Sequence, residues 1–265
     1  FDEDSGIWKP IKVSGLTFGT NGFYLDFQAS GNLGNDANGG TDLGESGLAA
    51  VDQSTDTCTN NFATMNPLIP GQTNYTYSDG NLTITQGSAA WVKSNSTFGM
   101  SSGKWYWEGK WVSGNYTVFA VDNTDTAAPY SATSNSAVGY KRNGNVEIGT
   151  DPQTDIAAYA HGDTVSVALD MDNDAVYFYK NGAIQNSGDP TSGASKTGAY
   201  ALPVANSTYF ANISPYGSGA TSMNFGSPPY AISSSNADED VFGNFEYAVP
   251  AGYFALCSKN LAEYG

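Results

Sequence analysis

The chain has 265 residues, of which 13% are aromatic and only 14% are charged, and it contains 31 glycines. This composition favours short strands joined by tight turns over a helical bundle. The formal net charge of −16 argues against a nucleic-acid partner, because the negative field repels phosphates. The negative charge either keeps the protein soluble or belongs to clustered Asp residues that bind cations. No apolar run approaches the roughly 20 residues of a membrane helix, so we expect no membrane insertion.

Residues 1–75 are predicted to form an extended N-terminal arm with a single strand at residues 22–27. The arm begins with Phe1 rather than Met, and we expect Phe1 to be an internal or processed start. Gly, Asn and Asp dominate residues 29–47, which is typical of a long irregular loop. The oxygens of Asn35, Asp36 and Asp42 in this loop could hold Ca²⁺.

From residue 76 onward the pattern becomes regularly β. Apolar and polar side chains alternate in short runs separated by turn residues, which indicates an antiparallel β-sandwich over residues 76–232. The clearest hairpin covers residues 163–180, and Asn143-Gly144 supplies the turn of another. We expect strands in 81–85, 104–108, 116–121, 137–142, 145–148, 163–170, 175–180, 209–213 and 220–225.

Residues 233–265 contain aromatic side chains on an irregular backbone and no helix of ordinary length is expected. We predict a C-terminal arm that packs on the sandwich or on a neighbouring molecule.

The predicted sandwich resembles a known family. Gly103-Lys-Trp-Tyr-Trp-Glu108 is similar to the opening strand of SPRY domains, and residues 162–182 are similar to their central hairpin. Asn224-Phe-Gly226 with Pro228 is similar to their closing strand. The resemblance implies a concanavalin A-like sandwich that binds partners through its loops and has no catalytic centre.

The flanking segments resemble large virion proteins of bacteriophages, which carry SPRY-like domains at the particle surface. The similar runs are Gly22–Phe27, Leu33–Asp36, Asp52–Leu68 and Gly252–Cys257. The resemblance implies a fibre, filament or decoration subunit, located on the virion or outside the cell. Its expected partners are copies of itself or other virion proteins.

Catalytic groups are scarce. His161 is the single histidine and is expected in a loop beside a turn. A Ser-His-Asp or Cys-His catalytic site therefore has little support. A glycosidase would need neighbouring carboxylates, whereas Glu108 and Glu147 fall on different predicted strands. Asp170, Asp172 and Asp174 have the spacing that opens a calcium loop, but the Gly and Glu that complete an EF-hand are missing. We therefore expect no enzyme and no cofactor, with Ca²⁺ as the one candidate ion.

Two further sets of residues remain as candidates. Cys58 and Cys257 form either a disulfide or two buried thiols, and the virion resemblance favours the bridge slightly, because Cys58 replaces an expected Pro.

A carbohydrate-binding role in host recognition is the alternative function, since aromatic side chains stack on sugars. Trp105 and Trp107 are expected to fill the core, and the candidate ligand-binding residues are Trp91, Trp111, Tyr130 and Tyr140. A glycoside hydrolase is a third, weaker alternative.

Overall fold

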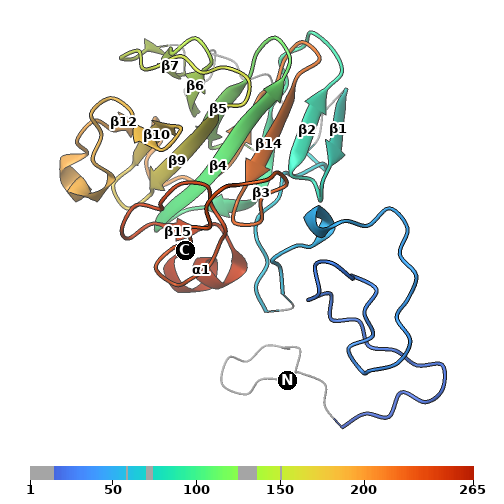
Figure 1. Cartoon of the computed structure of the whole chain (residues 1–265). Helices are drawn as coiled ribbons and strands as arrows, with labels where there is room; N and C mark the ends of the chain where they lie inside the picture. The colour runs from blue at the N-terminus through green and yellow to red at the C-terminus, as the bar shows by residue number, and fades with distance from the viewer. Residues whose placement is uncertain (1–14, 58, 70–73, 125–135, 150) are drawn as a thin grey trace. The chain divides into compact units, whose positions relative to one another are not determined.

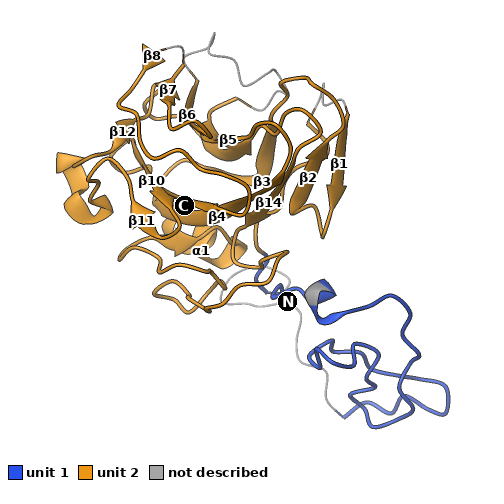
Figure 2. Ribbon diagram, turned by 45° about the horizontal axis from the view of Figure 1, so that its top comes forward, with its two compact units in different colours: residues 1–61 blue, residues 62–265 orange. Residues whose placement is uncertain are grey.

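The structure is a computed structural model that describes residues 15–57, 59–69, 74–124, 136–149 and 151–265. It divides into two compact units, residues 1–61 and 62–265 (Figure 2). The second unit begins before the predicted boundary at residue 76, because Phe62, Ala63 and Met65 are buried in its core. Among the described residues, no helix has the length and apolar character needed to cross a membrane.

Two β-sheets form the larger unit (Figure 1). The first sheet has the order β1-β2-β14-β4-β9-β10-β11, with β12 beside β10 and β15 beside β4. The second has the order β3-β13-β5-β6-β7-β8. All pairings are antiparallel except that of β15 with β4. The predicted all-β, antiparallel sandwich is therefore confirmed.

The strands are β1 (Tyr75–Ser78), β2 (Thr83–Gln86), β3 (Ser94–Met100), β4 (Lys104–Ser113), β5 (Val118–Asp122), β6 (Ala137–Lys141), β7 (Val146–Ile148), β8 (Asp151–Pro152), β9 (Thr164–Asp170), β10 (Ala175–Lys180), β11 (Ala183–Ile184), β12 (Tyr200–Ala201), β13 (Tyr209–Ile213), β14 (Ala220–Asn224) and β15 (Phe254–Ala255). The helices are η1 (Ala50–Asp52), η2 (Pro190–Ser195) and α1 (Ser258–Tyr264).

The core lies between the two sheets. Alternation along β4 places Trp105 and Trp107 in it, and they are 0% and 1% exposed, as the sequence predicts. Across the sheets, Tyr140 of β6 packs on Phe178 of β10 with ring centroids 5.4 Å apart. These aromatic rings supply large buried areas and specific edge contacts, which stabilise the sandwich.

The opposite face of β4 is also buried, because the C-terminal segment covers it. Phe245 meets the Tyr106 ring edge-on at 5.1 Å, and β15 pairs with β4 at Trp105 and Tyr106 (Figure 1). This segment therefore packs on the sandwich of its own chain. It also contains α1, a helix that the sequence pattern did not indicate.

One carboxylate organises the backbone of this C-terminal segment. Asp238 is 7% exposed. One oxygen accepts the N–H groups of Asp240 at 3.0 Å and Phe242 at 2.8 Å, and the other accepts Ala255 N–H at 2.9 Å and Asn260 Nδ2 at 2.8 Å. Buried backbone donors need such acceptors, so Asp238 holds the turn, β15 and α1 together.

The smaller unit has little regular structure in its described part. The strand predicted at residues 22–27 does not form. Within that run, Tyr24 accepts Ala37 N–H at 2.8 Å and donates its backbone N–H to the Asp36 carboxylate at 2.9 Å, and the Phe27 carbonyl accepts Gln53 Nε2 at 2.5 Å. A strand needs a partner along its length, and these isolated contacts do not form a ladder.

Candidate functional site

A shallow pocket of about 380 Å³ lies between β4, the turn after β6 and the loop before β9. Its volume is at the lower end of the range for small-ligand sites. Strand β4 contributes Trp111, and the turn between β6 and β7 contributes Arg142 and Asn143. The loop before β9 supplies residues 158–161, including Tyr159 and His161. Apolar walls with a few polar groups are typical of a ligand site.

The pocket continues into a run of aromatic rings. Arg142 lies over the rings of Trp111 and Tyr116, with its Cζ 5.6 and 5.1 Å from their centroids. Tyr116 contacts Trp91 edge-on at 5.2 Å, and Trp91 stacks on Tyr216 at 4.6 Å. We call Tyr216, Trp91, Tyr116, Arg142, Trp111 and His161 the aromatic strip.

Backbone hydrogen bonds hold the strip in place. Tyr116 and Tyr216 exchange both backbone hydrogen bonds, at 3.3 and 2.9 Å. The Arg142 carbonyl accepts Tyr159 N–H at 2.9 Å. Gly144 ends the Arg142 turn with a φ of +95°, and a Cβ there would collide with the carbonyl of Ile156, so this turn requires glycine. The strip is therefore built before any ligand arrives.

The polar groups of the pocket have distinct roles. The Gly114 carbonyl can only accept, so His161 donates Nε2–H to it at 2.8 Å, while the His161 ring contacts Trp111 at 4.1 Å. Tyr116 donates its hydroxyl to Asn143 Oδ1 at 3.1 Å. Burial raises the pKa of Tyr116, and the Arg142 guanidinium partly offsets that rise. Tyr116 thus stays a neutral donor at physiological pH.

The four predicted ligand-binding residues have different locations. Trp111 lines the pocket although only 2% of its surface is exposed, and Trp91 is half-buried in the strip. Tyr140 is fully buried and packs edge-on against Tyr159 at 4.9 Å, which corrects its expected surface role, since its alternation position faces the opposite sheet. Tyr130 lies outside the described residues.

The sequence did not predict Arg142 and Tyr116 as site residues, because no local pattern shows which aromatic rings meet the guanidinium. One signal was available, since Arg142 is the single arginine of the chain.

The carboxylates considered for catalysis are not together. Glu108 is buried on β4, where its oxygens accept the backbone N–H groups of Glu246 at 3.0 Å and Tyr247 at 2.8 Å. Burial raises its pKa, and these hydrogen bonds partly offset the rise. Glu147 lies on β7 in the other sheet and forms an ion pair with Lys141.

The predicted calcium ligands Asp36 and Asp42 bind their own loop. The Asp36 carboxylate accepts the N–H groups of Tyr24, Asn38 and Gly40 at 2.9, 3.0 and 3.0 Å. Asp42 accepts Asp36 N–H at 3.0 Å and Asn32 Nδ2 at 2.8 Å. These hydrogen bonds lower the pKa of both carboxyl groups. No group of three or more His, Cys, Asp or Glu within the described part of the chain could hold a metal ion. That finding does not cover a set of two aspartates and an asparagine, so Ca²⁺ at Asn35, Asp36 and Asp42 stays a prediction.

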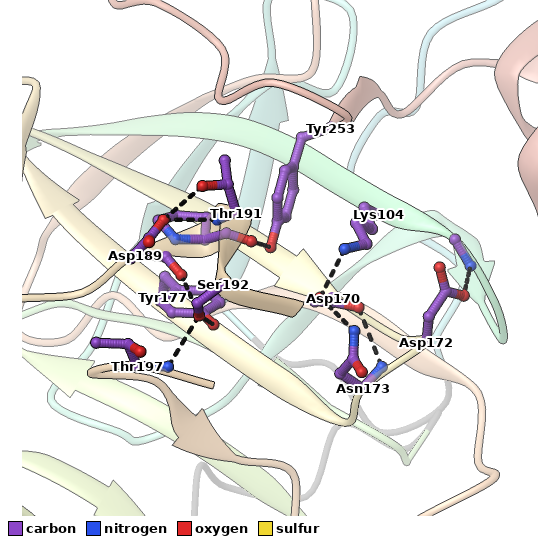
Figure 3. Close-up of polar contacts among 12 residues, drawn as sticks. Lys104, Asp170, Asp172, Asn173, Tyr177, Asp189, Thr191, Ser192, Thr197 and Tyr253 are labelled. Atoms are coloured by element: carbon purple, nitrogen blue, oxygen red, sulfur yellow. Dashed lines mark hydrogen bonds and ion pairs between the residues drawn. The ribbon is translucent and has the colours of Figure 1, made fainter. Parts of the chain in front are cut away.

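Asp170 and Asp172 stabilise the hairpin turn between β9 and β10 (Figure 3). Asp170 pairs with Lys104 at 3.0 Å and accepts Asn173 Nδ2 at 2.9 Å. Asp172 accepts Gly103 N–H at 2.8 Å. Asp170 and Asp172 thus tie this turn to the start of β4, as expected for a polar hairpin turn.

The possible disulfide involves one residue outside the described set. Cys257 is fully buried and lies opposite Phe62 in an antiparallel bridge. Cys58 is not described, so the Cys58–Cys257 pairing stays a prediction.

No family model matches the sequence, and no curated protein matches it. Among solved structures, the chain is similar to the SPRY domain of human HERC1, with 19% identity, a TM-score of 0.46 and coverage of 57% of this chain and 92% of that one. It is also similar to the TRIM65 PSpry domain, with 11% identity, a TM-score of 0.45 and coverage of 62% and 89%. Stonustoxin follows with 16% identity, a TM-score of 0.44 and coverage of 62% and 26%.

Proposed function

We propose that this chain is a non-enzymatic recognition domain that binds saccharides through the aromatic strip. The observation that supports the proposal is the continuity of the strip. Trp91 precedes β3, Trp111 lies on β4 and Tyr116 follows β4, yet ring and cation–π contacts join them, through Arg142, beside one pocket. A surface of rigid aromatic rings binds with little loss of conformational freedom.

The polar groups of this site fit sugar hydroxyls. Asn143 Oδ1 already accepts from Tyr116, so its amide NH₂ is the group that can donate to a ligand. Sugar rings present C–H faces to aromatic rings and hydroxyls to such amides. The combination of stacking surface and adaptable donors therefore supports a saccharide over a purely apolar ligand.

The placement of the carboxylates supports a role without catalysis. The Glu108 oxygens accept donors from the backbone and from Tyr106 and Asn224, and Glu147 belongs to the other sheet. Hydrolysis of a glycosidic bond normally uses two facing carboxyl groups, and these two residues do not provide them.

The test is titration of the full chain on a glycan array, followed by calorimetry with each sugar that binds. Trp91→Ala should weaken binding about tenfold, equivalent to about 1.4 kcal/mol, and circular dichroism checks that the variant is folded. The control is Leu68→Ala, a residue that is 84% exposed. Equal affinities for wild type and Trp91→Ala would contradict the role of the strip.

We also propose a second role, assembly on the surface of a bacteriophage particle with copies of the chain or other virion proteins. The observation that favours it is the apolar surface of residues 15–61. Phe23 and Phe27 are 50% and 55% exposed, and Leu16, Leu43 and Leu48 are exposed as well. Where such side chains adjoin one another, they form the kind of apolar patch that marks a contact surface.

Multi-angle light scattering tests the assembly role. The wild type should form oligomers, and the double variant Phe23→Ser/Phe27→Ser should shift the population toward monomer. A wild type that stays monomeric at high concentration would refute the role. Imaging of intact particles would then show whether the subunit belongs to a fibre, a filament or a decoration.

A further inference from the structure

We infer that the saccharide bound by this site carries an acidic group, a carboxylate or a sulfate, which is held by Arg142. This inference rests on the proposed saccharide function and specifies the chemical class of the ligand. It concerns the pocket at the end of the strip, where Arg142 and His161 meet Trp111.

The distribution of charge is the first argument. The chain has 26 acidic residues, yet no Asp or Glu lines this pocket. The single arginine and the single histidine of the whole chain both do. A strongly acidic protein that places its only guanidinium in an acid-free pocket has a local site for an anion. The guanidinium is also the group whose geometry matches carboxylate and sulfate oxygens.

The state of the guanidinium is the second argument. In the part of the chain that the structure describes, no carboxylate forms an ion pair with Arg142. The rings of Trp111 and Tyr116 orient it by cation–π contacts instead. Such contacts leave the five N–H donors unused. The rings of Trp111 and Tyr116 thus orient the planar guanidinium of Arg142, and its N–H donors remain available to a ligand.

The neighbouring groups suit the rest of an acidic sugar. His161 uses Nε2–H for the Gly114 carbonyl, which leaves Nδ1 as its ring nitrogen for a sugar hydroxyl. Asn143 offers its amide NH₂ as a donor. Arg142 binds the acid, and the other two groups bind hydroxyls.

The net charge limits the ligand further. A dense polyanion would be repelled by a chain of charge −16, and one guanidinium does not reverse that repulsion. The fitting ligand is a saccharide with widely spaced acidic groups or a single acidic terminal unit. An acidic peptide is the competing class of ligand, but it would bring no sugar ring to stack on the surface of Trp91 and Tyr216.

The experiment compares matched acidic and neutral sugars on the full chain. The pairs are glucuronate with glucose and galacturonate with galactose, followed by sulfated and unsulfated oligosaccharides on the array. The readouts are affinity and the shift of the Trp111 indole N–H resonance, which is assigned by its loss in Trp111→Phe. We expect the acidic member of at least one pair to bind about tenfold more tightly. The two arms distinguish a carboxylate from a sulfate.

Variants separate charge at this site from charge in general. Arg142→Gln should remove the preference for the acidic sugar, while Arg142→Lys should retain part of it because Lys keeps the charge without the planar fork. Lys196→Gln, which removes one positive charge from an exposed turn far along the sequence, should leave the preference unchanged. Circular dichroism checks that each variant is folded, and Arg142→Lys carries the test if Arg142→Gln is not.

Three results would overturn the inference, and they differ in what they say about the function. Equal binding of acidic and neutral sugars would refute the acidic ligand and leave saccharide recognition intact. Binding of no saccharide at all would refute both. Arg142-dependent binding of acidic peptides with no saccharide bound would replace the saccharide with a peptide.

Discussion

The Glu108 carboxylate and the backbone N–H of Tyr247 form a hydrogen bond of 2.8 Å, although 139 positions separate them in the chain. Glu108 is fully buried, so this contact joins the middle of β4 to the C-terminal segment away from water. Tyr106 and Asn224 donate to the same carboxylate at 3.1 and 3.3 Å. The carboxylate therefore acts as an attachment point for residues 233–265.

Replacing Glu108 with Ala should destabilise the protein by about 1–3 kcal/mol or more, because buried donors lose their acceptor. Urea unfolding at neutral pH measures the change. The matched control is Glu147→Ala, whose partly exposed ion pair with Lys141 should contribute about 1 kcal/mol or less. Equal losses in the two variants would contradict the attachment role of Glu108.

The same carboxyl group should make stability depend on pH. Burial raises the pKa of Glu108 above its ordinary value of 4.5, so the folded state binds this proton more tightly than the unfolded chain. The contribution is therefore complete below about pH 4.5 and declines as the pH rises through the folded pKa. Unfolding free energies across this range, compared with the non-titrating variant Glu108→Gln, should show a wild-type advantage that shrinks with increasing pH. An advantage that grows would refute the assignment.

The ion pair between Lys93 and Asp122 is another test of burial. Its atoms lie 2.6 Å apart, and the two side chains are only 2% and 4% exposed. Asp122→Ala should cost about 3–5 kcal/mol, because it leaves the buried ammonium without its counter-ion. Lys141→Met, in the more exposed pair with Glu147, should cost about 1 kcal/mol or less. Guanidinium denaturation of both variants would decide this, and similar small losses would count against the prediction.

The contact between the two sheets can be tested at Gly109. A Cβ at this position would meet the Phe119 ring of the opposite sheet and Met223 Sδ at 2.9 Å. Gly109→Ala should therefore destabilise the fold by about 1–3 kcal/mol through overpacking. Gly87→Ala is the control, since its nearest neighbour is Asn74 O at 3.5 Å. If both variants melt at the wild-type temperature, the inter-sheet spacing is not limited by Gly109.

The sequence predicted the sandwich well because strand alternation and turn chemistry are local properties. Trp105 and Trp107 alternate with polar neighbours at both ends of their run, and both are in the core. The hairpin of residues 163–180 follows from two β-branched and aromatic runs around a polar turn. The N-terminal run 22–27 has the same local pattern but forms no strand, because strand formation depends on a partner that the pattern does not contain.

The sequence by itself determined the β class, the positions of the main strands and the scarcity of groups for catalysis, since composition and period-two alternation carry that information. Only the tertiary structure decided which aromatic residues meet. It buried Tyr140 between the sheets and brought Trp91 and Trp111 together through Tyr116 and Arg142. The reason is that the strip is assembled from a strand and several loops that include segments far apart in the chain. Their positions in space depend on sheet order and on long-range hydrogen bonds rather than on any local pattern.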